Sequence, residues 1–178
     1  MKSVKNDTSS YTDNGVIVHD VKLLICDVDG TLTNGTVTYD NNGKSYKTFS
    51  VLDGMGFELL RQYQIDIAWI SGSNDESITI RANHLGIKNL FLGIKNKVKV
   101  IESTLIPTLN ITWENIAYIG DDINDLEGIK KARVSAVPAD AWIKDHNCHD
   151  YTCTRNGGDG AVREFIEKII KSTIFQTW

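Results

Sequence analysis

Residues 21–33 read VKLLICDVDGTLT, an apolar run that leads directly into two carboxylates, a glycine and a threonine. A short run of this composition is typical of a buried strand, and an acidic turn is a simpler but less typical interpretation of the residues after it. Side chains two apart on a strand point the same way, so Asp27 and Asp29 can face one substrate while Val28 turns away. At an effective dielectric constant near 20, two such charges about 5 Å apart repel by about 3 kcal/mol. A proton or a divalent cation would relieve this repulsion, and Mg²⁺ prefers such oxygen ligands.

A second apolar run ends in acids in the same way. Ile116 to Ile119 is a strand candidate, and residues 120–125 continue it as GDDIND. Because the carboxyl ends of parallel strands share one edge of a sheet, Asp121 is expected to meet Asp27 and Asp29 there as a third oxygen ligand. Alternatively, the acids after this strand could cap the next helix. Capping would account for one of them, but it does not explain a doubled acid that follows a glycine.

Two weaker features lie between these stretches. Ser71 and Gly72 follow the strand candidate Ile65–Ile70, where a hydroxyl and free backbone N–H groups could hold phosphate oxygens. Lys95 and Lys97 stand at a predicted helix start, where a cation would balance the charge of a phosphate. A Ser-Gly pair is common in ordinary loops and most lysines are solvated, so these features count only in combination.

Short apolar runs alternate with longer amphipathic ones along the chain. The predicted strands are Val21–Cys26, Ile65–Ile70, Asn89–Leu92, Ile116–Ile119 and Val134–Val137. The predicted helices are Met55–Tyr63, Asp75–Leu85, Lys97–Thr104, Asp125–Lys131 and Gly160–Lys171. This alternation predicts an α/β fold, a doubly wound parallel sheet with helices on both faces.

One stretch breaks the alternation. Asn41, Asn42 and Gly43 form a turn tripeptide between Thr36–Tyr39 and Ser45–Phe49, which predicts a β-hairpin over about residues 34–49. The hairpin is inserted between the first strand and the first helix, so it is expected to lie over the carboxyl edge of the sheet. It is large enough to lean over a site but too small to enclose one.

The composition is that of an ordinary globular protein, with 178 residues, 41% hydrophobic and 24% charged. Residues 1–15 are polar and without an apolar period, which predicts a flexible tail before a single domain over residues 16–178. A net charge of -4 argues against nucleic acid as a partner. Without an apolar run near the roughly 20 residues of a membrane span, or an apolar signal segment, we expect no membrane partner and a cytoplasmic protein. The 3 cysteines include no CxxC pair, which argues against a structural zinc or a disulfide framework.

In chain order these features are Asp-x-Asp-Gly-Thr, Ser-Gly, Lys and Gly-Asp-Asp-x-x-Asp. This order resembles the haloacid dehalogenase-like (HAD) phosphohydrolase superfamily from about Val21 to Lys171. The resemblance implies that Asp27 is a nucleophile that forms an aspartyl-phosphate, and that Asp29 protonates the leaving oxygen and later activates water. It also implies Mg²⁺ bound by Asp27, the backbone carbonyl of Asp29 and Asp121, with Asp122 in the outer sphere. The implied phosphate ligands are Thr31, Ser71, Gly72 and Lys97, where Lys97 is counted four on from Gly93 and is oriented by Asp125.

Members of this superfamily usually carry a large cap domain, whereas here only the hairpin is inserted. The chain is similar to the capless branch that contains the 3-deoxy-D-manno-octulosonate 8-phosphate phosphatases and the phosphatases of nonulosonate (sialic-acid type) 9-phosphates. Further matches are Thr33–Gly35, FSVLDGMG over residues 49–56 and GGDGAVRE over residues 157–164. The resemblance implies a small-molecule phosphate ester as substrate, most specifically a 2-keto-3-deoxy sugar-acid phosphate, and a homotetramer in which hairpins pack together.

One residue departs from the pattern of this branch. Leu52 stands where the octulosonate enzymes typically have a basic residue, so a cation that could pair with the carboxylate of the sugar acid is missing. Recognition of that carboxylate through Arg61, Arg155 or Arg163 stays open, and Arg163 is the substrate-binding candidate that we select.

Two alternatives come from other classes of protein. Receiver domains of signalling proteins also combine strand-end acids, a hydroxyl and a lysine, but their acceptor aspartate lies in mid-chain, whereas here the motif is on the first strand. A non-catalytic partner domain of a sugar-activating transferase is the second alternative, and the complete set of acids argues against it.

Overall fold

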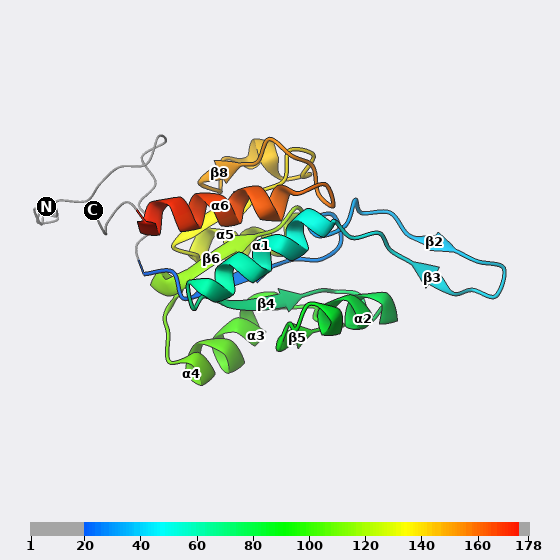
Figure 1. Cartoon of the computed structure of the whole chain (residues 1–178), viewed down its shortest axis with the longest axis horizontal. Coiled ribbons are helices and arrows are strands. Elements are labelled where there is room, and N and C mark those ends of the chain that lie inside the picture. Colours follow the sequence, from blue (N-terminus) through cyan, green and yellow to red (C-terminus); the bar gives the residue numbers. More distant parts are fainter. Residues whose placement is uncertain (1–19, 175–178) are drawn as a thin grey trace, which may run out of the picture.

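A six-stranded parallel sheet forms the centre of the computed structural model, which describes residues 20–174 (Figure 1). The tail predicted for residues 1–15 lies outside these residues. The strands are β1 (Leu23–Cys26), β4 (Asp66–Ile70), β5 (Asn89–Phe91), β6 (Ile116–Ile119), β7 (Val134–Val137) and β8 (Tyr151–Thr152). Their spatial order is β5-β4-β1-β6-β7-β8, which confirms the predicted doubly wound sheet. Since β1 pairs with both β4 and β6, the segments that leave these three strands start side by side.

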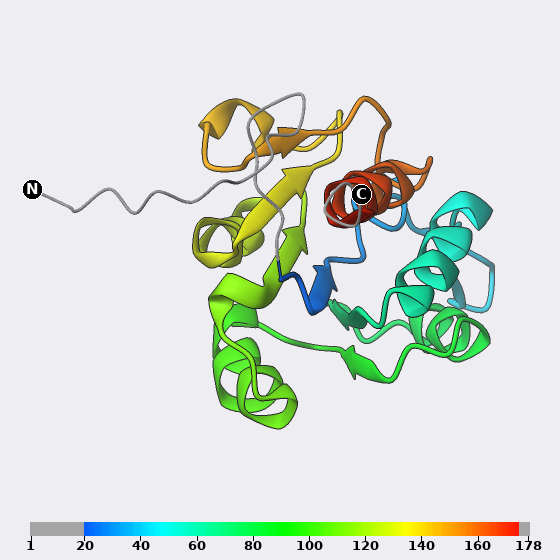
Figure 2. The ribbon, with the colours of Figure 1, turned by 60° about the vertical axis from the view of Figure 1, so that its left-hand side comes forward.

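Helices cover both faces of the sheet (Figure 2). One face carries α1 (Val51–Gln62), α2 (Glu76–His84) and α6 (Ala161–Ile174). The other carries α3 (Lys97–Val100), a π-helical turn (Ile101–Leu105), α4 (Ile106–Leu109) and α5 (Leu126–Lys131). Short 3-10 turns lie at Trp113–Asn115, Ile123–Asp125 and Lys144–His146. Within residues 20–174, no helix is both long enough and apolar enough to span a bilayer.

The alternating side chains of β1 explain why the sheet is buried on both faces. Leu24 and Cys26 belong to the apolar cluster under α1, α2 and α6, whereas Leu23 and Ile25 belong to the cluster under the helices of the opposite face. All four side chains are fully buried. A central parallel strand therefore has no solvated face, and its first polar residues, the acids, come where the strand ends.

The predicted hairpin is present and projects from the body of the protein (Figure 1). Its strands are β2 (Thr38–Tyr39) and β3 (Ser45–Tyr46), which pair antiparallel and form a sheet of their own. The predicted strands were therefore too long. Gly43 has a φ of +80° in the connecting turn, a conformation that glycine adopts without steric cost.

Several other boundaries differ from the predictions for local reasons. Helix α1 begins at Val51 rather than Met55, because the Ser50 hydroxyl caps it by accepting a hydrogen bond from the backbone N–H of Leu52. The helical segment that starts at Lys97 continues to Leu109 rather than ending at Thr104, since a wider π turn precedes Pro107, which has no N–H to donate.

Strand β8 was not predicted, because two residues are too few to show a period. The remaining predicted ends are shifted by up to three residues. These shifts leave the positions of the acidic segments unchanged.

Candidate active site

Acidic side chains from two distant segments meet at the carboxyl edge of β1 and β6. Carboxylate oxygens of Asp27, Asp121 and Asp125 all lie within 4.8 Å of one another. Gly30 allows this approach: a Cβ built on it would lie 2.0 Å from Oδ2 of Asp121, and its φ of +89° also favours glycine. The structure thus brings Asp27 and Asp121 together as expected, but the third carboxylate of the cluster is Asp125 and not Asp29.

Lys97 lies in the middle of this cluster. Its ammonium group donates hydrogen bonds to Oδ1 of Asp27 and, at 2.7 Å, to Oδ1 of Asp125. The residue is only 2% exposed, whereas Lys95 is exposed to solvent. Of the two lysines considered from the sequence, the structure thus brings Lys97 to the acids.

Asp125 is fully buried and both of its carboxylate oxygens are occupied. Its Oδ1 accepts hydrogen bonds from Lys97 and from the Tyr118 hydroxyl, each at 2.7 Å. Its Oδ2 accepts from the backbone N–H groups of Asp121 at 3.3 Å and Asp122 at 3.5 Å. With four donors around it, Asp125 is suited to hold Lys97 and the loop after β6 in place rather than to bind a metal ion.

The cluster carries an excess of negative charge in a buried place. Three carboxylates and one ammonium group leave two negative charges when all are ionised. Burial, reinforced by the charge of Asp125, raises the pKa of Asp27 well above its usual range. Burial likewise raises the pKa of Asp121 to about 6. Burial alone would lower the pKa of Lys97, but the charges of Asp27 and Asp125 raise it above its ordinary value. Such a cluster favours a divalent cation.

Asp29 stands apart from these three carboxylates, and its side chain has partners of its own. Its Oδ2 accepts a hydrogen bond of 3.2 Å from the Ser71 hydroxyl, and its Oδ1 pairs with the ammonium group of Lys47. The Ser71 oxygen in turn accepts the backbone N–H of Ser73 at 3.0 Å. The predicted phosphate-binding hydroxyl therefore lies beside the predicted acid–base carboxylate, and their roles stay predictions.

Three other predicted residues also lie at this edge of the sheet. The buried Thr31 hydroxyl donates to Oδ1 of Asp121 at 3.3 Å. Gly72 is exposed next to Ser71. Asp122 caps the 3-10 turn Ile123–Asp125 by accepting the backbone N–H of Ile123 at 2.7 Å, so the capping interpretation left open by the sequence holds for this acid.

Arg163 is not joined to the acidic cluster by any hydrogen bond or ion pair among the described residues. Its guanidinium group pairs with Glu167 at 2.8 Å, and its backbone N–H donates to the buried Asp53 at 2.8 Å. With Leu52 and Arg155 it lines a cavity of about 520 Å³ between α1, β8 and α6. The structure therefore gives Arg163 a structural partner, and its role in substrate binding stays a prediction.

Two residues of the site escaped the sequence analysis. Tyr118 looked like an ordinary strand residue, but its hydroxyl reaches Asp125. Lys47 looked like a hairpin residue, although its place two positions before Phe49 could have indicated that it turns toward the body.

The parallel sheet, with its acids gathered after β1 and β6 around one lysine, defines a phosphatase of the HAD superfamily, and comparisons with known proteins agree. No protein-family model matches the chain. The 3-deoxy-D-manno-octulosonate 8-phosphate phosphatase KdsC of Haemophilus influenzae is 38% identical over 164 residues, which are 90% of this chain and 91% of that protein. The protein of the same name from Escherichia coli K12 is 37% identical over 150 residues, 84% of this chain and 79% of its own length. The chain belongs to the KdsC-type phosphatases of this superfamily.

Solved structures give the same result. The chain resembles the crystal structure of a 3-deoxy-D-manno-octulosonate 8-phosphate phosphatase from Yersinia pestis with a TM-score of 0.86 and 35% identity, over 94% of this chain and 95% of that one. The phosphatase of the same name from Moraxella catarrhalis, in complex with a magnesium ion, a phosphate ion and a KDO molecule, has a TM-score of 0.83 and 35% identity, over 87% and 88% of the two chains. The predicted HAD-type fold is confirmed.

Proposed function

We propose that this protein hydrolyses 3-deoxy-D-manno-octulosonate 8-phosphate with Mg²⁺, through an aspartyl-phosphate on Asp27. The observation that carries the proposal is the buried cluster of Asp27, Asp121 and Asp125 around Lys97, whose two excess negative charges call for a divalent cation. The KdsC proteins are phosphatases of this substrate, and they match nearly the whole chain.

The donor set fits magnesium, which takes oxygen ligands. Carboxylates of Asp27 and Asp121 and the backbone carbonyl of Asp29 would hold the ion, with Asp122 in the outer sphere. When bound, Mg²⁺ would neutralise charge on the phosphate and help to align it for in-line attack. Asp125 is left out of this set, since its oxygens already accept four hydrogen bonds.

Each residue of the site then has its own role in the reaction. An oxygen of Asp27 attacks phosphorus, the bond from phosphorus to the sugar oxygen breaks, and Asp29 gives its proton to that oxygen. Asp29 next takes a proton from water, the water oxygen attacks phosphorus, and the bond to Asp27 breaks. Throughout, Lys97 balances phosphate charge while Thr31, Ser71 and Gly72 hold phosphate oxygens.

The identity of the sugar acid in the substrate depends on which residue binds its carboxylate. Leu52 supplies no cation for the carboxylate of the octulosonate, so a phosphorylated nonulosonate is the second candidate substrate. Arg163 and Arg155, which line the cavity beside Leu52, are candidates for the missing contact. Phosphate release from a panel that contains both sugar-acid phosphates would decide between them, and we expect the octulosonate ester to give the higher kcat/KM.

We expect the protein to act as a cytoplasmic homotetramer. Exposed aromatic side chains on the hairpin, Tyr39 at 67% and Tyr46 at 47%, support association of hairpins from several copies. Sedimentation at working concentrations tests this: a monomer with full activity would contradict it.

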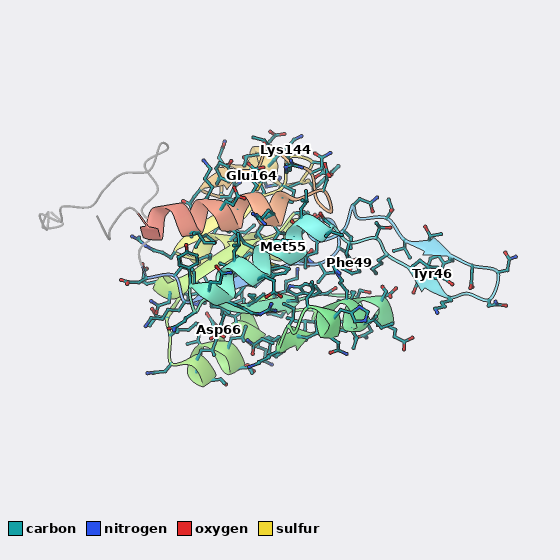
Figure 3. The ribbon with its side chains drawn as sticks, viewed as in Figure 1. Tyr46, Phe49, Met55, Asp66, Lys144 and Glu164 are labelled. Atoms are coloured by element: carbon teal, nitrogen blue, oxygen red, sulfur yellow. The ribbon has the colours of Figure 1, made fainter. Side chains whose placement is uncertain are left out.

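The experiment that tests the proposed chemistry is an assay of phosphate release with the purified protein. We expect turnover with Mg²⁺, loss of turnover on chelation and recovery on adding Mg²⁺ back. Asp27→Asn should lose nearly all activity, since the amide is a poor nucleophile. Asp66→Asn is the matched control, because Asp66 is an exposed acid at the start of β4, on the opposite edge of the sheet (Figure 3). Full turnover in Asp27→Asn would contradict the proposal.

A further inference from the structure

The base of the hairpin reaches the carboxylate that we assign to proton transfer. The ammonium group of Lys47 pairs with Oδ1 of Asp29, while the Ser71 hydroxyl bonds Oδ2 at 3.2 Å. The Lys47 side chain is only 3% exposed, whereas that of Asp29 is 34% exposed. A buried cation from the insertion therefore holds one oxygen of a carboxylate that opens to solvent.

The sequence of the segment after β3 explains why Lys47 turns inward. Ser45, Lys47 and Phe49 are partly buried, whereas Tyr46 and Thr48 between them are exposed. This period of two is that of extended chain, so Lys47 and Phe49 share a side. Figure 3 shows Tyr46 out on the hairpin and Phe49 where the hairpin joins the body.

Two contacts fix this segment against the body. The Phe49 ring stacks on the buried Trp69 of β4, with ring centroids 6.3 Å apart and planes 8° from parallel. The Ser45 side chain hydrogen bonds Asp75, the residue that caps α2. Although burial acts in the opposite direction, hydrogen bonds from Ser45 and Ser77 and the charge of Lys47 hold the pKa of Asp75 below its usual range. The residues on either side of Lys47, Ser45 and Phe49, thus hold this segment to α2 and β4.

We propose that Lys47 is a positioning residue for the reaction, which holds the Asp29 carboxylate at the angle from which it protonates the leaving oxygen. The inference rests on the proposed role of Asp29. It gives the hairpin a part in the chemistry of its own subunit, in addition to any part in association.

The physical reason is that a carboxylate on a half-open surface turns about its side-chain bonds. Lys47 and Ser71 bind different oxygens of Asp29, so together they define the plane of the carboxylate before substrate binds. The single Ser71 proton passes to a phosphate oxygen when substrate binds, so Lys47 is then the contact that holds Asp29. Misplacing a reacting group by about 1 Å costs about 10²-fold in rate. Removing Lys47 takes this contact away, so the carboxylate can rotate during the reaction.

The test compares two aryl esters that differ in how much their leaving group needs a proton. The p-nitrophenolate ion leaves readily without one, whereas phenolate leaves far better when it is protonated. We expect Lys47→Met to lower kcat/KM for phenyl phosphate by about tenfold or more, and for p-nitrophenyl phosphate by less than about threefold. The ratio kcat/KM is the right measure, because it reports transfer to Asp27 and not the later hydrolysis.

Three further variants make the result decisive. Lys44→Met is the matched control, since Lys44 is an exposed lysine of the same hairpin, and we expect both of its rates to equal those of the parent. Asp29→Asn should show the same dependence on leaving group more strongly. Lys47→Gln keeps an N–H donor without the charge and serves if Lys47→Met does not fold, as judged by its thermal unfolding.

The possible outcomes separate this inference from the proposed function. Equal losses on both esters, or an unchanged rate on phenyl phosphate, would overturn the role of Lys47 as long as Asp29→Asn shows the leaving-group dependence. Absence of that dependence in Asp29→Asn itself would overturn the assignment of Asp29, and with it the inference. A rise in KM that is equal for both esters, with kcat unchanged, would make Lys47 a substrate-binding residue and would also overturn the inference.

Discussion

Replacing Asp125 by asparagine tests whether this buried carboxylate organises the site. The side chain keeps its size and one oxygen, but the other oxygen becomes an NH₂ group. The oxygen that remains is best placed toward Lys97 and Tyr118, whose hydrogen bonds of 2.7 Å are the shorter ones. The NH₂ group then faces the backbone N–H groups of Asp121 and Asp122, so donors meet donors.

The magnitude can be worked out from the distances. At an effective dielectric constant near 20, the attraction between Asp125 and Lys97 at 2.7 Å is about 6 kcal/mol. Asp27 and Asp121, each within 4.8 Å of Asp125, together repel it by about 7 kcal/mol. These charge effects nearly cancel, so the hydrogen bonds decide. A bond to a charged acceptor contributes about 1.5 to 3 kcal/mol, and the two lost bonds are long, at 3.3 and 3.5 Å. We expect the free energy of unfolding to fall by about 3 kcal/mol.

Urea unfolding with chelator present measures this change, and the midpoint of thermal unfolding should fall by about 6 to 12 °C. We also expect kcat to fall at least about tenfold, because Lys97 loses half of the charge that holds it. Asp66→Asn is the matched control, since Asp66 is an exposed acid at the start of β4, away from the acidic cluster. An Asp125→Asn protein within about 0.5 kcal/mol of the parent and with the parent's kcat would refute the reasoning.

Three further predictions concern the cation, a glycine and pH. Mg²⁺ at 100 times its Kd should raise the free energy of unfolding by about 2.7 kcal/mol, measured by urea unfolding with and without chelator. The Asp121→Asn protein should lose most of this gain. A gain in Asp121→Asn equal to that of the parent would contradict the metal site. Gly30→Ala should abolish activity and destabilise the fold by more than the roughly 1 kcal/mol expected for Gly43→Ala. Both glycines have positive φ, but only at Gly30 would the added Cβ lie 2.0 Å from Oδ2 of Asp121. Equal losses in thermal unfolding would refute this. Burial raises the pKa of Asp53 to about 6, so its carboxyl keeps a proton in the folded state that the unfolded chain loses near pH 4. Stability should therefore fall by at most about 3 kcal/mol as the pH rises through this window, and urea unfolding of Asp53→Asn should show a flatter profile.

The parts of the site that the sequence predicts are those whose position is set by strand direction alone. Asp27 and Asp121 each follow an apolar strand, and parallel strands end at one edge, so their meeting needs no knowledge of packing. Lys97 was harder, because two lysines stand at the same helix start. Lys97 is preferred over Lys95 because it lies four residues after Gly93, as in the superfamily that the sequence resembles. The structure shows Lys97 buried and Lys95 exposed.

The contacts that the sequence could not predict depend on tertiary packing. The Tyr118 hydroxyl reaches Asp125 only because the chain turns back after β6 and caps itself through Asp122. Lys47 reaches Asp29 only because Phe49 packs on Trp69, which fixes the side to which the hairpin base turns. No local pattern encodes either distance, since both join segments whose relative placement is set by the core.

The electrostatic repulsion between the clustered carboxylates explains why the site is built on a rigid part of the sheet. Isolated carboxylates at these separations would move apart or take up protons. Here β1 and β6 are paired along four residues each and are buried on both faces, so the segments that carry Asp27 and Asp121 cannot separate without opening the core. The core thus holds the acids at a spacing that costs free energy without a cation and is relieved when a cation binds. A phosphatase that must bind its metal ion and its substrate's phosphate in the same small space gains from this arrangement, because the site does not reorganise on binding.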